Sequence, residues 1–301
     1  MSFKMKIVRL IVKKMSKGMF NADVMDVQAI RDKLAKAYAE HKVEKGVAEM
    51  FDTYNGVEVA VFTPEHPTSE NIVYYVHGGG LVTGDRSTAG PYSSQLALAT
   101  GCRVIACSYR LAPEDPFPAG VNDSYEVYKY LVNNNPNSKI SLIGESGGAY
   151  LSLVIALKAK DDKIKLPSSV VLNSIVADNS GEIKRVDTRE ETTVTVAGLE
   201  QLADMSTPNI KDRTNPYVSP ILGDYKGLPP MKIVYDKGEL LAIDSKLVAE
   251  KAKKAGVLVE VTEYKGCFHA FTTTGKDLPE SKRELAESAK FMLKSFMPDP
   301  S

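Results

Sequence analysis

The stretch Ile140-Ser141-Leu142-Ile143-Gly144-Glu145-Ser146-Gly147-Gly148 decides the fold. Its first part is an apolar run that predicts a short buried strand, and residues 149–160 after it predict a helix. Between them lies the pattern Gly-x-Ser-x-Gly, which is typical of a sharp strand-to-helix turn that presents a serine hydroxyl. Such a turn leaves no room for a Cβ atom at either flanking position, which explains the glycines at 144 and 148. The alternative interpretation is a tight glycine turn that carries an inert serine.

Short apolar runs alternate with longer helical patterns on both sides of this turn. The expected strands cover residues 57–63, 72–76, 104–109, 140–143, 170–175, 231–235 and 257–264. The expected helices cover residues 24–38, 86–100, 121–132, 149–160, 240–254 and 280–296. This alternation is typical of an α/β fold with a mainly parallel central sheet and helices on both faces.

Residues 178–225 break this rhythm, because they are polar and proline-containing and show few strand-like runs. We therefore expect this segment to be an insertion that lies over the sheet as part of a helical cap. Residues 1–50 are expected to supply N-terminal helices to the same cap. The core then consists of residues 51–177 and residues 226–301.

The N-terminal segment is basic, since residues 1–20 contain six lysines and arginines and no acidic residue. Its apolar runs are too short for a secretory signal or a membrane span. Apolar residues instead recur at helical spacing, at Phe3, Ile7, Leu10, Ile11 and Met15. The pattern favours an amphipathic helix packed on the body of the protein, and the alternative is a helix that rests on a lipid surface.

His77-Gly78-Gly79-Gly80 follows the expected strand 72–76. Three consecutive glycines let the backbone approach a ligand closely, and their N–H groups can stabilise an oxyanion. A phosphate-binding loop is the alternative for a glycine-rich turn after a strand. However, no Gly-Lys-Ser/Thr sequence follows, and Gly-x-Gly-x-x-Gly is not matched.

A partner for the serine can be found by elimination. The chain has four histidines, at positions 41, 66, 77 and 269. Where a serine sits on this kind of turn, the chain order is serine, then acid, then histidine. Only His269 lies after Ser146, in a loop just past the strand 257–264. We therefore predict His269 as the general base.

The acid should lie in the loop after the strand 231–235, where three carboxylates qualify. Asp236 abuts the strand, Glu239 lies near the start of the next helix, and Asp244 lies about one turn into it. The position favours Glu239 and leaves Asp236 and Asp244 as alternatives.

Together these motifs resemble the hormone-sensitive-lipase-like branch of the α/β-hydrolases, over most of the chain from about Tyr54 onward. The matching motifs are His77-Gly78-Gly79-Gly80, Tyr109-Arg110-Leu111-Ala112-Pro113-Glu114 and Leu228-Pro229-Pro230. Two motifs depart from the family pattern. The turn more often reads Gly-Asp-Ser-Ala-Gly-Gly, and the acid motif is usually Asp-Pro-Leu-x-Asp, whereas this chain has Glu239-Leu240-Leu241-Ala242-Ile243-Asp244.

The resemblance implies a serine carboxylesterase that acts on short-chain, acetyl-like acyl esters, with a cap over its site. It implies Ser146 as nucleophile, His269 as base and Glu239 as acid. The expected oxyanion donors are the N–H groups of Gly78, Gly79 and Gly147. No cofactor or metal is needed, and the partner is a small-molecule ester. An amidase or lactonase with the same triad, or a non-catalytic small-molecule receptor, is the alternative.

The overall composition does not indicate a macromolecular partner. Lysine plus arginine equals aspartate plus glutamate at 38 each, so we expect no nucleic-acid binding. The three cysteines show no Cys-x-x-Cys spacing, so a disulfide framework is not expected and a reducing, cytoplasmic location is. A homodimer is compatible with the resemblance, because dimers through the last strand are common in that family.

Overall fold

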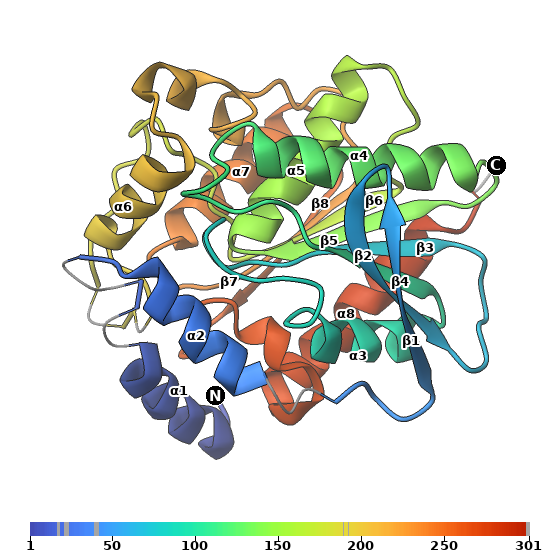
Figure 1. Cartoon of the computed structure of the whole chain (residues 1–301), viewed down its shortest axis with the longest axis horizontal. Helices are drawn as coiled ribbons and strands as arrows, with labels where there is room; N and C mark the ends of the chain where they lie inside the picture. The colour runs from blue at the N-terminus through green and yellow to red at the C-terminus, as the bar shows by residue number, and fades with distance from the viewer. Residues whose placement is uncertain (17–18, 21–23, 39–41, 189, 192, 299–301) are drawn as a thin grey trace.

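A computed structural model describes residues 1–16, 19–20, 24–38, 42–188, 190–191 and 193–298 of the chain. Its centre is an eight-stranded sheet in the order β1-β2-β4-β3-β5-β6-β7-β8 (Figure 1). The strands are β1 (Val47–Tyr54), β2 (Val57–Pro64), β3 (Ile72–Val76), β4 (Arg103–Cys107), β5 (Ile140–Glu145), β6 (Ser169–Asn173), β7 (Met231–Asp236) and β8 (Val259–Tyr264). β2 runs antiparallel to β1 and β4, and the other neighbours are parallel. The predicted α/β class with a mainly parallel sheet is therefore confirmed.

The central strands are apolar throughout because both of their faces are covered. Every residue of β3, β5, β6 and β7 is buried. Strands buried on both sides are expected to form continuous apolar runs rather than alternating ones. That is the pattern from which these strands were predicted.

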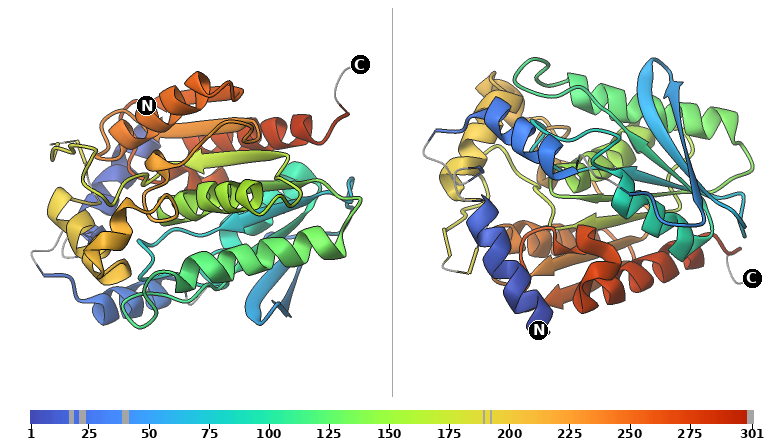
Figure 2. Two further views of the ribbon diagram at one scale, coloured as in Figure 1. Left: turned by 90° about the horizontal axis from the view of Figure 1, so that it is seen from above. Right: turned by 60° about the horizontal axis from the view of Figure 1, so that its bottom comes forward.

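Helices cover both faces of the sheet (Figure 2). They are α3 (Gly90–Thr100), α4 (Ala119–Asn134), α5 (Gly147–Asp161), α7 (Ala242–Lys254) and α8 (Pro279–Ser295). Side chains of α4, α5 and α7 share one buried cluster with the sheet, and side chains of α3 and α8 share the other. The sheet is therefore the middle of three layers, with its carboxyl ends free to carry a site.

Three further helices lie near the carboxyl ends of the strands (Figure 1): α1 (Phe3–Ser16), α2 (Val27–Tyr38) and α6 (Val196–Ser206). The short 3-10 helices are η1 (Ile210–Thr214), η2 (Pro220–Leu222), which packs against α5 and α7, and η3 (Phe271–Asp277), which packs against α3 and α8. Ile30 of α2 and Leu202 of α6 belong to one buried cluster, so the N-terminal segment and the insertion pack together. Within the described ranges, no helix combines the length and apolar character needed to cross a bilayer.

Several expected boundaries differ from the observed ones, and two of these differences have a clear physical reason. Residues 1–50 were assigned to helices alone, but β1 begins at Val47 and pairs along its whole length with β2. Six consecutive residues of β1, from Ala48 to Thr53, are exposed at the edge of the sheet, so it lacks the apolar run that identifies a strand. The helix expected from residue 86 begins only at Gly90, because the Asp85 side chain accepts the N–H groups of Ser87 and Thr88 in a turn.

Candidate active site

Ser146 lies on the turn between β5 and α5, in a conformation that side chains rarely adopt. Its φ of 52° and ψ of −120° lie in a region that costs a non-glycine residue energy, so the surrounding structure must hold it there. The Ser146 N–H donates to the Asn173 carbonyl at 2.9 Å, and the Tyr150 N–H donates to the Ser146 carbonyl at 3.0 Å. The turn therefore fixes the serine at the carboxyl end of the sheet.

The two flanking glycines are required by close backbone contacts. A Cβ atom added to Gly144 would lie 2.4 Å from the Gly148 carbonyl oxygen. A Cβ atom added to Gly148 would lie 2.0 Å from the carbonyl oxygen of Val76, in the neighbouring strand β3. These carbonyls belong to helix α5 and strand β3 and cannot move away without disrupting those elements, so the steric reason predicted for the glycines is present in the structure.

A pocket of about 240 Å³ opens at the serine. Ser146 and His269 line it together with Gly79 and Gly80 from the loop after β3. Its apolar wall comes from the tyrosines of the core and from the cap: Phe20, Leu34, Tyr75, Tyr92, Leu199 and Leu202. The pocket can therefore bind a small apolar group against the serine, with a histidine and backbone amides beside it.

His269 meets a carboxylate inside this site. Its Nδ1 atom lies 3.2 Å from Oε2 of Glu239, and the hydroxyl of Ser174 donates to the same oxygen at 2.9 Å. Burial of Glu239 raises the pKa of its carboxyl to about 7, against the effect of the histidine. Burial alone lowers the pKa of His269, but the bond to Glu239 and the nearby charge of Glu191 outweigh it, so that this pKa is raised. The pair therefore favours a protonated imidazole.

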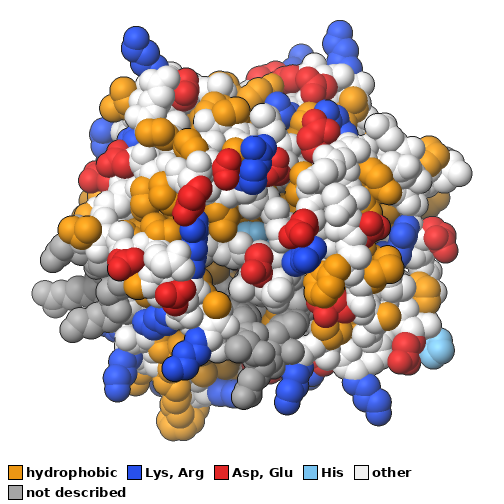
Figure 3. All heavy atoms as spheres, viewed as in Figure 1, with side chains coloured by type: hydrophobic (Ala, Val, Ile, Leu, Met, Phe, Trp, Pro, Cys, Tyr) orange, Lys and Arg blue, Asp and Glu red, His pale blue; other side chains and the backbone are white. Residues whose placement is uncertain are grey.

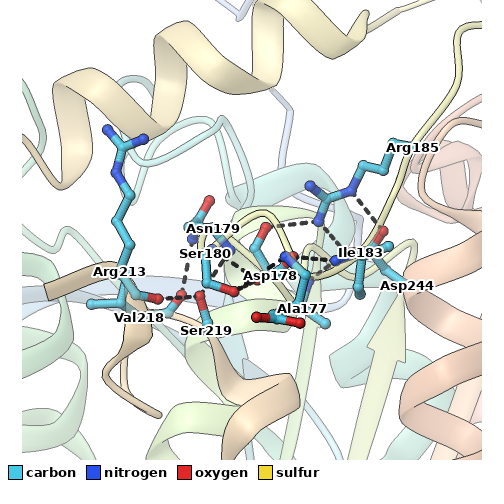
Figure 4. Close-up of polar contacts among 11 residues, drawn as sticks. Ala177, Asp178, Asn179, Ser180, Ile183, Arg185, Arg213, Val218, Ser219 and Asp244 are labelled. Carbon is cyan, nitrogen blue, oxygen red and sulfur yellow. Dashed lines mark hydrogen bonds and ion pairs between the residues drawn. The ribbon is translucent and has the colours of Figure 1, made fainter. Parts of the chain in front are cut away.

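The two alternative acids have other partners. Asp236 accepts the N–H groups of Gly238 and Cys267, at 2.9 and 2.7 Å, and so holds the histidine loop against the end of β7. Asp244 forms a buried ion pair with Arg185 and accepts the Ala177 N–H (Figure 4). Among the three predicted candidates, the structure brings only Glu239 to the histidine.

One predicted oxyanion donor is wrong. The Gly78 N–H donates to Oε1 of Glu145 at 2.6 Å, so its only hydrogen is already used. All three glycines line the pocket, but among the described contacts only the Gly78 N–H is bonded to Glu145, which leaves Gly79 and Gly80 as the donors from this loop. A Cβ atom on Gly147 would lie 3.5 Å from the Gly80 nitrogen, so the first residue of α5 faces this part of the loop. Gly79 and Gly147 remain candidates as predicted, and Gly80 replaces Gly78.

Comparison with known proteins agrees with this geometry. A family model described as the alpha/beta hydrolase fold matches residues 73–273. The chain belongs to the α/β-hydrolase family. An esterase from Acinetobacter venetianus is 31% identical over 228 residues, which cover 74% of this chain and 75% of that protein. An acetyl-hydrolase from Streptomyces hygroscopicus is 33% identical over 221 residues, which cover 72% of this chain and 74% of that protein.

Solved structures share the fold of this chain. A hormone-sensitive lipase from a metagenome library is 26% identical, with a TM-score of 0.89 and coverage of 97% of this chain and 98% of that chain. An esterase of the bacterial hormone-sensitive lipase family shares the fold with a TM-score of 0.89 at 24% identity, over 99% of both chains. The predicted resemblance to this branch of the α/β-hydrolases is therefore confirmed.

Two glutamates of this α/β-hydrolase site were not predicted. The first is Glu145, a buried residue that lines the pocket and accepts the Tyr75 hydroxyl at 2.9 Å as well as the Gly78 N–H. Burial raises the pKa of Glu145 to about 7, although these bonds oppose the shift. Its place before the serine was visible in the motif, but its contact with the glycine loop depends on the pairing of β3 with β5.

The second is Glu191, which the insertion brings to the acid loop. One of its oxygens accepts the Leu240 N–H at 2.8 Å, next to Glu239, and the other accepts the N–H and hydroxyl of Thr193. The charge of Glu191 raises the pKa of His269. No signal in the polar sequence of the insertion marked this residue.

His77 supports the glycine loop rather than the reacting atoms. Its ring stacks on Tyr109, with centroids 4.3 Å apart, and its Nδ1 lies 2.8 Å from the Gly78 carbonyl oxygen. Complete burial lowers its pKa to about 4, so the ring is neutral near pH 7. Gly84 is required here, because a Cβ atom there would lie 2.4 Å from that ring.

The three cysteines and the metal-binding side chains add no further chemistry to this site. Cys102, Cys107 and Cys267 are buried as free thiols in three different hydrophobic clusters. Across the described part of the chain, no group of three or more histidine, cysteine or acidic side chains is placed to hold a metal ion.

Proposed function

We propose that this chain is a carboxylesterase that hydrolyses short-chain acyl esters through Ser146, His269 and Glu239. The observation that carries the proposal is the contact of His269 Nδ1 with Glu239, while the same histidine lines one pocket with Ser146. A carboxylate on one ring nitrogen fixes the tautomer in which the other nitrogen can accept the serine proton.

The reaction follows from these positions. His269 takes the Ser146 proton as the serine oxygen attacks the ester carbonyl, and the alcohol leaves with a proton returned by the histidine. Water then attacks the acyl-enzyme, and His269 again acts first as base and then as acid. Glu239 holds the imidazole and stabilises its charged form.

Backbone amides supply the electrostatic stabilisation. Gly79 and Gly80 lie at the pocket, and Gly147 faces Gly80 from the start of α5. One donor aimed at the developing oxyanion typically contributes about 3 kcal/mol to the transition state. Gly79 and Gly80 both have positive φ, a backbone conformation that favours glycine and lets the loop approach a ligand closely.

The preference for short acyl chains rests on the size and lining of the pocket. A volume of about 240 Å³ is at the small end for a ligand site, and aromatic and aliphatic side chains line most of it. An acetyl or butyryl group fits such a space, whereas a decanoyl chain needs an extension between the cap helices. The acetyl-hydrolase named among the relatives supports this choice.

The test is hydrolysis of 4-nitrophenyl acetate, butyrate and decanoate by the wild type and by Ser146→Ala. Turnover that falls from butyrate to decanoate and disappears in the variant supports the proposal. Absence of turnover by folded wild type, or equal turnover by the variant, contradicts the role of Ser146. A 4-nitroanilide of the same acyl group, cleaved faster than the ester, would contradict esterase specificity.

A further inference from the structure

Helix α1 has apolar side chains on two faces, and only one of them is covered. Met5, Val8 and Val12 point toward the body and pack against a cluster that includes Cys267 and Phe268, next to His269. This face explains why the helix is held on the protein. It leaves the other apolar residues of α1 unexplained.

The second face carries a hydrophobic stripe in contact with solvent. Phe3 is 77% exposed and Leu10 is 70% exposed, and Ile7 and Ile11 are also exposed. At 3.6 residues per turn these four side chains lie within about 100° of the helix circumference. Single exposed apolar residues are ordinary, but four on one arc of one helix form a patch that marks a binding surface.

Positive charge surrounds this stripe. Within its fourteen residues α1 has five basic side chains, Lys4, Lys6, Arg9, Lys13 and Lys14, and no acidic one. Figure 3 shows hydrophobic side chains that project at the lower edge of the molecule, with lysine and arginine side chains beside them, where Figure 1 places α1. The whole chain is neutral, so this charge is local to the N-terminal segment.

We propose that α1 docks this protein on an anionic lipid surface. An amphipathic helix with a basic border lies in the plane of the headgroups, with its apolar side chains in the acyl boundary. The four lysines of α1 match the negative charge of such a surface, whereas Arg9 donates to the Glu190 carbonyl on the body of the protein. A second copy of the chain is a poorer occupant, because pairing of two α1 stripes brings four lysines against four others. The proposal concerns binding and does not depend on the proposed hydrolysis.

The experiment is flotation of the full chain with vesicles of phosphatidylcholine alone and of phosphatidylcholine mixed with phosphatidylglycerol, at low and high NaCl. Leu10→Ser removes one exposed side chain of the stripe and should weaken binding to the anionic vesicles about tenfold. Leu258→Ser is the matched control, because Leu258 is 74% exposed before β8 and outside the stripe. Lys4→Gln should weaken binding about fivefold at low salt and less at high salt.

The proposal is supported if the wild type and Leu258→Ser float with anionic vesicles while Leu10→Ser stays behind. It is overturned if the wild type does not float, or if Leu10→Ser and Leu258→Ser float equally. A dimer in solution that Leu10→Ser dissociates would also overturn it, because a second copy would then cover the stripe. Thermal unfolding and hydrolysis of 4-nitrophenyl acetate, both unchanged in Leu10→Ser, show that any loss of flotation is not a loss of folding.

Discussion

Replacing Glu145 by glutamine should make the stability of the protein less dependent on pH. The carboxyl of Glu145 is buried at the end of β5, and one of its oxygens accepts the Gly78 N–H and the Tyr75 hydroxyl. Its other oxygen is buried without a hydrogen-bond partner among the described residues. Burial raises the pKa of this carboxyl from 4.5 to about 7. A neutral amide has the same shape and keeps an acceptor oxygen for both donors, but it has no proton to lose.

The size of the effect follows from that difference in pKa. The unfolded chain releases the proton near pH 4.5, whereas the folded state keeps it until about pH 7, so the folded state loses stability as the pH rises through this window. The difference corresponds to about 3 kcal/mol in total, of which about 2.5 kcal/mol falls between pH 5 and pH 8. Glu145→Gln lacks this loss, so relative to wild type it should gain about that amount between the two pH values.

The assay is urea unfolding of wild type and Glu145→Gln at pH 5 and pH 8. Contributions from Glu239 and His269 are present in both proteins and cancel to first order in the difference. Glu260→Gln, which removes an exposed carboxylate, controls for the change in net charge. If the difference between variant and wild type is the same at both pH values, the carboxyl of Glu145 titrates alike in the folded and unfolded states, and the reasoning from burial is refuted.

Three other substitutions test the acid side of the site. Glu239→Gln should lower kcat for 4-nitrophenyl acetate by about 10³-fold or more, because the histidine loses the carboxylate that stabilises its charge. Asp244→Asn should change kcat only a few-fold but lower the free energy of unfolding by about 3 kcal/mol, because the partly buried Arg185 loses its carboxylate partner and, among its described hydrogen bonds, keeps only the one to the Asp178 carbonyl. The acid limb of kcat/KM in wild type should lie above pH 6.5, since the pKa of His269 is raised, and Glu191→Gln should move it to lower pH. A profile unchanged in that variant contradicts the coupling.

The sequence predicted those elements of the fold whose burial shows as a local pattern of apolar residues. β5, its serine turn and α5 were expected because an apolar run, two spaced glycines and a second apolar run follow one another directly. β1 was not expected as a strand of its own, because its stability comes from pairing with β2 while its side chains face solvent. The spacing of apolar residues identifies segments that are buried, and the side chains of an exposed edge strand are mostly not buried.

Individual residues of the candidate site could be predicted only where their order along the chain identifies them. His269 followed from its position after the serine, and Glu239 followed from position and resemblance. The error at Gly78 has a different origin, because the partner of its N–H is Glu145, brought to it by the parallel register of Val76 with Gly144. Spacing along the chain does not show which backbone N–H will donate to a side chain on a neighbouring strand. Glu191 reaches the site for the same reason, through the path of an insertion rather than through a motif.

Three glutamates around one histidine have a consequence for catalysis as well as for stability. Glu239, Glu191 and Glu145 each favour the charged form of His269 through their negative charges. This charge helps the imidazolium that forms in the transition state, but it also reduces the fraction of neutral base below the pKa of the histidine. Because Glu145 keeps its proton up to about pH 7, its contribution grows only as the histidine becomes able to act as base. The ionised carboxylate of Glu145 lowers the stability of the folded protein above about pH 7. In the same pH range its negative charge stabilises the imidazolium that forms during the reaction.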